Sequence, residues 1–218
     1  LSSMSIVPLG MMVNGLFLGV WIVLPKYVAN SKNPLVITTI CSIMSWAIFA
    51  YLALEIANYT TAINLSPFML GVLGLCFLIL VSVFFNIKTR PSPKGNNKVP
   101  LPILMARGIA AAVAIGCALL LAKLGEPLIA GLASAFPAIF LTSMVALWIS
   151  QGVTVPQGAA APMMLGGASV AVYALIVMWS IPNFGIIIGS SVAWVASVMM
   201  WSFPAYVILR KYRHLSVD

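Results

Sequence analysis

The chain has 218 residues, of which 62% are apolar and only 6% are charged. Soluble domains carry about 25% charged residues, so a soluble fold of this length would leave much of its apolar surface uncovered. The solvent is therefore expected to be lipid, where backbone polar groups must pair inside helices or a closed barrel. The apolar runs are continuous and about twenty residues long, which favours helices over alternating barrel strands. The sequence predicts an all-α, polytopic membrane protein.

The net charge of +8 comes from 11 Lys and Arg residues against 3 acidic residues. The basic residues fall in loops and in the tail, where membrane topology and anionic lipid account for them. We therefore expect the lipid bilayer as a partner and no nucleic acid. Cys41, Cys76 and Cys117 lie in separate apolar runs without CxxC spacing, so neither a disulfide framework, a metal site nor a cofactor is indicated.

Seven transmembrane helices are predicted, at about 6–28, 35–55, 66–87, 101–123, 127–150, 160–181 and 185–208. The prolines after Asn33 and Glu126 start helices, where a missing N–H costs nothing. The turn signal Pro182-Asn183-Phe184-Gly185 separates the last two helices. A polar segment ending at Pro100 divides the chain into two halves. The predicted organisation is a three-helix unit at 1–88, a basic linker at 89–100, a second unit at 101–181, and an extra helix with a basic tail at 182–218.

Charge asymmetry predicts the orientation. Seven spans place the loops after the first, third and fifth helices on the same side as the C-terminus. That side holds nine basic residues: Lys26, Lys32, Lys88, Arg90, Lys94, Lys98, Arg210, Lys211 and Arg213. The other side holds one, Lys123, so the positive-inside rule predicts a cytoplasmic C-terminus. Asn58, in an N-x-T triplet on the predicted outer side, is a candidate glycosylation acceptor.

The two halves resemble each other. Asn33-Pro34-Leu35 corresponds to Glu126-Pro127-Leu128, and Pro67-Phe68-Met69-Leu70-Gly71 corresponds to Pro162-Met163-Met164-Leu165-Gly166. Extending the first match pairs Asn14 with Arg107 and Gly15 with Gly108. Because each unit has three helices, the second would be inverted relative to the first, as in many secondary transporters. The predicted fold is an inverted 3+3 helix repeat plus one extra helix.

Arg107 and Asn14 are the leading candidates for a solute path. Arg107 lies inside the fourth predicted helix, where a charge is costly. It either snorkels to the cytoplasmic headgroups or faces a polar cavity and binds an anionic group. Asn14 is polar too and, like Arg107, is followed by glycine. A polar residue followed by glycine at equivalent positions of the two halves is what a symmetric solute path would show.

Other polar or helix-breaking residues are secondary candidates. Glu55 is either an interfacial carboxylate or a proton-coupling acid. Glu126 is interpreted as a charge at a helix N-terminus. Pro137, inside the fifth predicted helix, frees a carbonyl and would kink that helix, and Gln151 ends the same helix. Tryptophans near helix ends, including Trp21, suggest an aromatic belt.

Small residues at four-residue spacing predict close helix packing. Gly15 and Gly19 lie in the first predicted helix, Gly108 lies in the fourth, and Gly185 and Gly189 lie in the seventh. Such stripes pack a bundle more often than they line a path.

Catalysis is poorly supported. The lone histidine, His214, lies in the tail, and the sequence offers no paired carboxylates, metal-ligand cluster or phosphate loop. We therefore expect no enzymatic activity.

The short apolar helices, the proline helix starts and the acidic Glu55 near a helix end resemble the helix pairs of the drug/metabolite transporter group. The resemblance covers the two predicted three-helix units, although the ten helices usual for that group are not present, and it supplies no binding residues. It implies transport of a small-molecule solute. The leading hypothesis is a transporter or channel with its path between the repeats. The alternative is a non-catalytic subunit or scaffold of a larger membrane complex, and either is compatible with homo- or hetero-oligomers.

Overall fold

A computed structural model of the protein describes residues 2–89, 91, 100–123 and 135–215. All regular secondary structure in these residues is helical, which confirms the predicted all-α class. The elements are α1 (Ser2–Val23), α2 (Pro25–Val28), α3 (Pro34–Ala62), α4 (Pro67–Lys88), α5 (Leu101–Lys123), α7 (Ala138–Gln151), α8 (Thr154–Ser197), the π-helix η1 (Val198–Ser202) and α9 (Phe203–Leu215).

Proline residues mark the beginnings of three helices. α2, α3 and α4 start at Pro25, Pro34 and Pro67, where the ring suits the first helical turn and the missing N–H would have no helical partner. Pro25 also divides the predicted helix at 6–28 into α1 and the short α2. At the other end of α7, Gly152 has φ 85° and ψ 172°, so the helix ends at Gln151 as predicted.

Four stretches of the described chain are long and apolar enough to cross a membrane. They are Ile6–Val28, Pro34–Thr60, Pro67–Lys88 and Thr154–Lys211. The last has 58 residues, and at about 1.5 Å per residue it is far too long for one crossing of a hydrocarbon core of about 30 Å. The lengths and compositions are those of a helical membrane protein. The count of seven helices stays a prediction.

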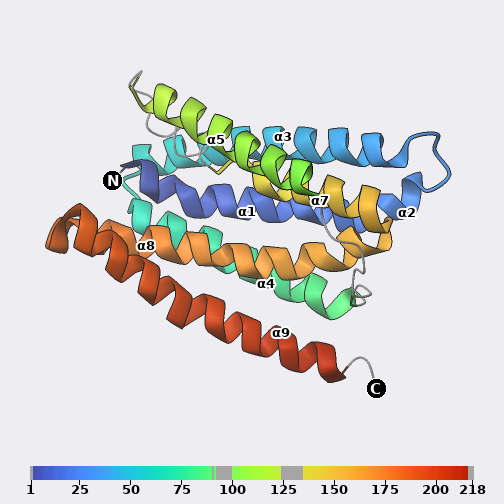
Figure 1. Ribbon diagram of the computed structural model, residues 1–218. Helices are drawn as coiled ribbons and strands as arrows, with labels where there is room; N and C mark the ends of the chain where they lie inside the picture. Colours follow the sequence, from blue (N-terminus) through green and yellow to red (C-terminus); the bar gives the residue numbers. More distant parts are fainter. Residues whose placement is uncertain (1, 90, 92–99, 124–134, 216–218) are drawn as a thin grey trace.

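The 58-residue stretch reverses direction at Gly185, which separates α8 into two arms (Figure 1). Gly185 has φ 74° and ψ 176°, a region that is essentially restricted to glycine. Next to the turn, the Ser180 hydroxyl donates to the Gly189 carbonyl at 2.9 Å. A Cβ on Gly189 would lie 2.8 Å from the Cα of Ile181. The predicted turn at 182–185 is therefore present, and Gly189 packs as expected. The packing role predicted for Gly185 is wrong, because its function is conformational.

The second arm of α8 continues through η1 into α9. Pro204 lies just after the π-turn, where it cannot donate to the carbonyl of Met200 and its ring would clash with that carbonyl in an α-helix. The wider π-turn relieves this conflict. The Trp201 indole N–H donates to the Leu165 carbonyl at 2.8 Å, which ties this arm to the first arm of α8.

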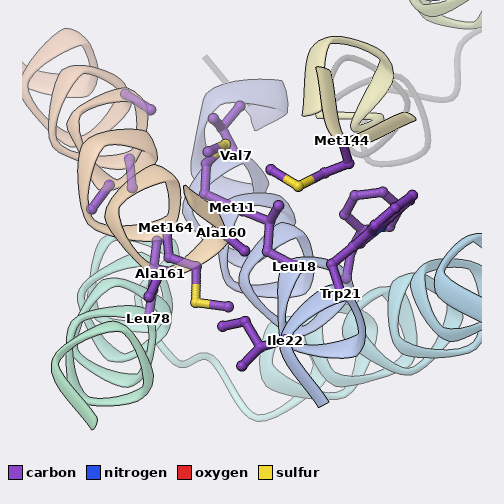
Figure 2. Packing of buried hydrophobic residues seen from close by; sticks show 14 residues of the cluster. Val7, Met11, Leu18, Trp21, Ile22, Leu78, Met144, Ala160, Ala161 and Met164 are labelled. Atoms are coloured by element: carbon purple, nitrogen blue, oxygen red, sulfur yellow. The ribbon is translucent and has the colours of Figure 1, made fainter. Parts of the chain in front are cut away.

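α1 is the central helix of the fold. It packs against α3, α4 and α8, and its Phe17, Leu18 and Trp21 are completely buried. Figure 2 shows Trp21 beside Met144 of α7, and Leu78 of α4 near Ala161 and Met164 of α8. The main core therefore joins α1, α4, α7 and α8.

The exterior of the bundle is apolar. Large exposed side chains occur along α3, α4 and the second arm of α8, among them Ile48, Leu80, Phe84, Ile187 and Trp194. Apolar surface on this scale would be unfavourable in water and suits lipid. This pattern agrees with the expectation from composition.

Charge separates the two ends of the bundle. α2, the C-terminal end of α4 and the C-terminal end of α9 lie at one end (Figure 1). We call it the basic end, because these elements carry Lys26, Lys88, Arg210 and Lys211. The start of α1, the C-terminal end of α5 with Lys123 and the Gly185 turn lie at the opposite end.

α1 and α5, which the predicted repeat makes equivalent, have different surroundings. α1 is enclosed by three helices, whereas α5 packs chiefly on α7. A Cβ on Gly15 would lie 2.6 Å from Leu78 Cδ1, but a Cβ on Gly108 would meet no described atom within 4 Å. No described residue therefore packs closely at Gly108, and the close-packing role of this glycine stays a prediction. The inverted repeat stays a prediction from the sequence.

Candidate functional site

Asn14 is the polar centre of the described bundle. Its side chain is only 3% exposed, and its amide joins three segments of the chain. The Nδ2 atom donates to the Ala135 carbonyl at 2.8 Å, and the Trp46 indole N–H donates to Oδ1 at 3.0 Å. Because an unpaired buried amide is costly, these bonds fix the start of α7 and the middle of α3 against α1.

Helical periodicity places Asn14 on the same face of α1 as Met4, Val7 and Met11. All four side chains line one cavity. The Sδ atom of Met11 also lies 3.6 Å from Asn14 Nδ2, which makes it a weak acceptor for the second amide proton. One stripe of α1 therefore forms a wall of the cavity and ends at a polar group.

The cavity has a volume of about 360 Å³, within the usual range for small-molecule sites of about 300–1,000 Å³. Its remaining lining comes from the start of α7, the segment before it and the middle of α8: Ala135, Phe136, Pro137, Ile139, Phe140, Val170, Tyr173 and Ala174. Three aromatic rings and two methionines therefore surround a space whose polar side chains are Asn14 and Tyr173.

The cavity is open on one side and closed toward the basic end. Ile139 and Val170 line it and are also 53% and 45% exposed, so the mouth lies on the apolar exterior between α7 and α8. Beyond Asn14, α1 continues into what we call the Trp21 cluster, made of Phe17, Trp21, Met144 and Trp148. The Trp21 and Trp148 rings meet edge to face with centroids 5.9 Å apart. This cluster separates the cavity from the basic end.

Trp21 does not belong to an aromatic belt, which corrects the prediction. Its side chain is completely buried in the core. Its indole N–H has no hydrogen-bond acceptor among the described residues. Trp21 follows Asn14 by two helical turns on the same face of α1, since Val7, Asn14 and Trp21 are spaced by seven residues. A buried donor therefore lies close to the closed end of the cavity.

Pro137 lines the cavity, but it does not kink a helix. It is the residue before α7, with φ −79° and ψ 40°, so the prediction of an internal proline is wrong. The missing N–H suits a helix start for the same reason as at Pro34 and Pro67. The described part of the predicted helix at 127–150 begins at Ala138, and residues 124–134, including Glu126, lie outside the described residues.

The other predicted path residues do not meet at this cavity. Gln151 is at the far end of α7 from Pro137, about 20 Å away at the usual helical rise. Glu55 is exposed on α3 and is not among the described lining residues. The backbone of Arg107 lies in α5, but its side chain is outside the described part of the structure.

The predicted glycosylation acceptor lies within a helix rather than in a loop. Asn58 is exposed on α3, and the hydroxyl of Thr60 donates to the Ala57 carbonyl at 2.9 Å. Modification of Asn58 stays a prediction. In α1, an added Cβ on Gly15 would lie 2.6 Å from Leu78 of α4, so Gly15 packs closely as predicted. An added Cβ on Gly19 would lie 3.5 Å from Cε2 of Phe85, an ordinary contact that does not require glycine.

Sequence reasoning missed Trp46, Phe136 and Tyr173 as members of the site. The Trp46 and Phe136 rings pack edge to face with centroids 5.0 Å apart, and Tyr173 comes from α8. These residues are separated by long stretches of chain and sit in apolar runs without a motif. No local signal in the sequence could have brought them together.

No protein-family model, curated protein or solved structure matches the chain. The class of protein is therefore defined by its fold and its cavity. The described chain is an all-helical bundle with four stretches suited to cross a membrane, and it contains a small, mainly apolar cavity beside a buried amide.

Proposed function

We propose that this protein is an integral membrane transporter or channel for a small solute, and that its path includes the cavity beside Asn14. The observation that carries the proposal is the cavity itself: it opens on one side of a bundle whose exterior is apolar, and it ends at a buried amide. Clefts between helices with a few convergent polar groups are the usual form of small-molecule sites.

We propose that the chain crosses the bilayer seven times, with the C-terminus on the cytoplasmic side. The alternation of helix direction in Figure 1 supports this arrangement. So does the position of Lys26, Lys88, Arg210 and Lys211 at the basic end, because positive residues favour the cytoplasmic side. The start of α1 and the Gly185 turn would then face the opposite side.

The one-sided shape of the cavity supports a gated path. From Met4 to Asn14, the lining face of α1 extends about 15 Å, which is half of a hydrocarbon core of about 30 Å. The cavity therefore occupies the half of the bundle away from the basic end. Solute movement toward the basic end would require the Trp21 cluster to separate. The N–H of Trp21, which has no acceptor among the described residues, would offer the next hydrogen bond along that route.

The scaffold alternative also has a specific observation in its favour. The polar atoms of Asn14 already have partners in Ala135 and Trp46, which is what a purely structural amide would show. A scaffold would keep the same core, and its apolar exterior would bind other membrane proteins rather than lipid alone. A transporter or channel needs an open cavity for its solute, whereas a scaffold does not.

Flux measurements distinguish these functions. The full chain is reconstituted in proteoliposomes, and uptake of uncharged, cationic and anionic solutes is compared with protein-free vesicles. We expect faster uptake of at least one solute, and we expect Val170→Trp, which fills the mouth, to abolish it. Val195→Trp is the matched control, because Val195 is 52% exposed on the second arm of α8 and does not line the cavity. Unchanged uptake of every solute would favour the scaffold.

Arg107 is tested in the same assay. If Arg107 binds an anionic solute through two parallel N–H bonds, Arg107→Lys impairs flux, since an ammonium cannot reproduce the planar fork. Arg107→Ala would then be more severe. If Arg107 only reaches the headgroups, Arg107→Lys retains full flux. The path would then depend on the cavity at Asn14 alone.

A further inference from the structure

We propose that the cavity beside Asn14 binds an uncharged, mainly apolar molecule that reaches it from the surrounding lipid. This inference rests on the proposed function and names the class of solute. Three features carry it: the absence of charge among the described lining residues, the position of the mouth, and the hydrogen-bonding capacity that the described contacts leave to Asn14.

The described lining residues offer no partner for a charged group. They are methionine, aliphatic and aromatic residues together with Asn14 and Tyr173, and none of them is Lys, Arg, His, Asp or Glu. A charge removed from water requires a counter-charge or several hydrogen bonds. Among the described lining residues, an anion would find only the Asn14 amide and the Tyr173 phenol as polar partners. The cavity therefore selects against anions.

The mouth of the cavity lies where lipid, rather than water, would meet the protein. Ile139 and Val170 form part of the lining and of the apolar exterior. Val170 follows the start of α8 at Thr154 by 16 positions, about 24 Å from the basic end of that helix. A molecule that enters between α7 and α8 must first dissolve in the bilayer, which favours uncharged molecules.

Asn14 can still accept or donate one hydrogen bond at the end of the cavity. Its Oδ1 atom has two lone pairs and accepts one described bond, from Trp46. The second proton of Nδ2 faces only the sulfur of Met11 at 3.6 Å, which is a poor acceptor that a ligand oxygen would replace. A ligand with one hydroxyl or carbonyl group fits this capacity.

A cation is the competing ligand class, because the faces of Phe136, Phe140 and Tyr173 would attract it. A permanent cation is, however, strongly disfavoured in the hydrocarbon from which the mouth is reached. The observations therefore favour the uncharged molecule, and a cationic probe provides the direct comparison.

Fluorine NMR on the full chain in nanodiscs tests the ligand class. Three probes share one fluorinated ring: 4-fluorobenzyl alcohol is uncharged, 4-fluorobenzoate is an anion and (4-fluorobenzyl)trimethylammonium is a cation. Empty nanodiscs correct for partition into lipid. We expect saturable binding of the alcohol and binding of both ions that is weaker by about tenfold or more, a difference of about 1.4 kcal/mol.

Two variants locate the binding. Val170→Trp should abolish saturable binding of the alcohol, and Val195→Trp, a substitution of an exposed valine outside the cavity, should leave it unchanged. Equal binding of the alcohol to both variants would overturn the proposal, as would the absence of saturable binding. If an ion binds as tightly as the alcohol and only Val170→Trp removes it, the solute class is wrong while the cavity remains a solute site. The flux assay decides separately whether any solute is transported.

Discussion

The indole N–H of Trp46 on α3 lies 3.0 Å from the amide oxygen of Asn14 on α1 and donates a hydrogen bond to it. The same amide donates to the carbonyl of Ala135 at 2.8 Å. One buried side chain therefore joins three segments that are far apart in the sequence, and it does so at the end of the cavity. Both the stability of the bundle and the shape of the cavity depend on this arrangement.

Removing the indole donor should therefore weaken the bundle. Trp46→Phe keeps an aromatic ring against Phe136 and leaves Asn14 Oδ1 without this donor. We expect the free energy of unfolding to fall by about 1–3 kcal/mol, measured by thermal melting in detergent with circular dichroism. Trp194→Phe is the control, because Trp194 is exposed on the second arm of α8. Equal melting of the two variants would show that the Trp46 bond contributes nothing.

Replacing a glycine with a larger residue should lower the melting temperature in α1 but not in α5. Gly15→Leu places a large side chain against Leu78, whose Cδ1 atom is already 2.6 Å from an added Cβ. Overpacking of this kind costs about 1–3 kcal/mol, so we expect a lower melting temperature. Gly108→Leu should melt close to the parent chain, since its surroundings in the described structure are open. If the two variants are equally destabilised, the predicted repeat describes the packing better than the structure does.

The reversal at Gly185 should resist any residue with a Cβ. Its φ of 74° and ψ of 176° belong to a region that costs other residues about 1–3 kcal/mol, so Gly185→Ala should lower thermal stability by that amount. The control is Gly166→Ala. Gly166 is exposed in the first arm of α8 with open space around it, and alanine favours a helix by up to about 1 kcal/mol. We therefore expect Gly185→Ala to lower the melting temperature and Gly166→Ala to raise it.

The proposed topology predicts which positions are accessible from each side. A reporter fused after Asp218 should remain cytoplasmic, and Lys32→Cys should react with a membrane-impermeant thiol reagent from that side. Tyr59→Cys, near the other end of α3, should react from outside. A chain in which Cys41, Cys76 and Cys117 are replaced by alanine provides the background. Labelling of both engineered cysteines from the same side would contradict the seven-span arrangement.

Several features were predictable from the sequence because their causes are local. The low content of charged residues predicted a chain suited to lipid, and the continuous apolar runs of about twenty residues predicted helices. Pro34 predicted a helix start, and Gly152 and Gly185 mark the helix end and the turn that the pattern indicated. Asn14 could also be predicted as a site residue from its local sequence, because a polar side chain inside an apolar run must find hydrogen-bond partners.

The tertiary structure alone decided what those partners are. Trp46, Ala135 and Tyr173 carry no motif, and they come together only because α3 and α8 pack against α1 while α7 packs against α3 and α8. The same reason explains the differences between prediction and structure. Gly15 and Gly108 look alike in the sequence, but an added Cβ would meet Leu78 at Gly15 and no described atom within 4 Å at Gly108. Trp21 is buried although it lies near a helix end. Composition and spacing determine which segments become helices. Which face of each helix is buried depends on neighbours from distant parts of the chain, so the cavity at Asn14 is a property of the packing.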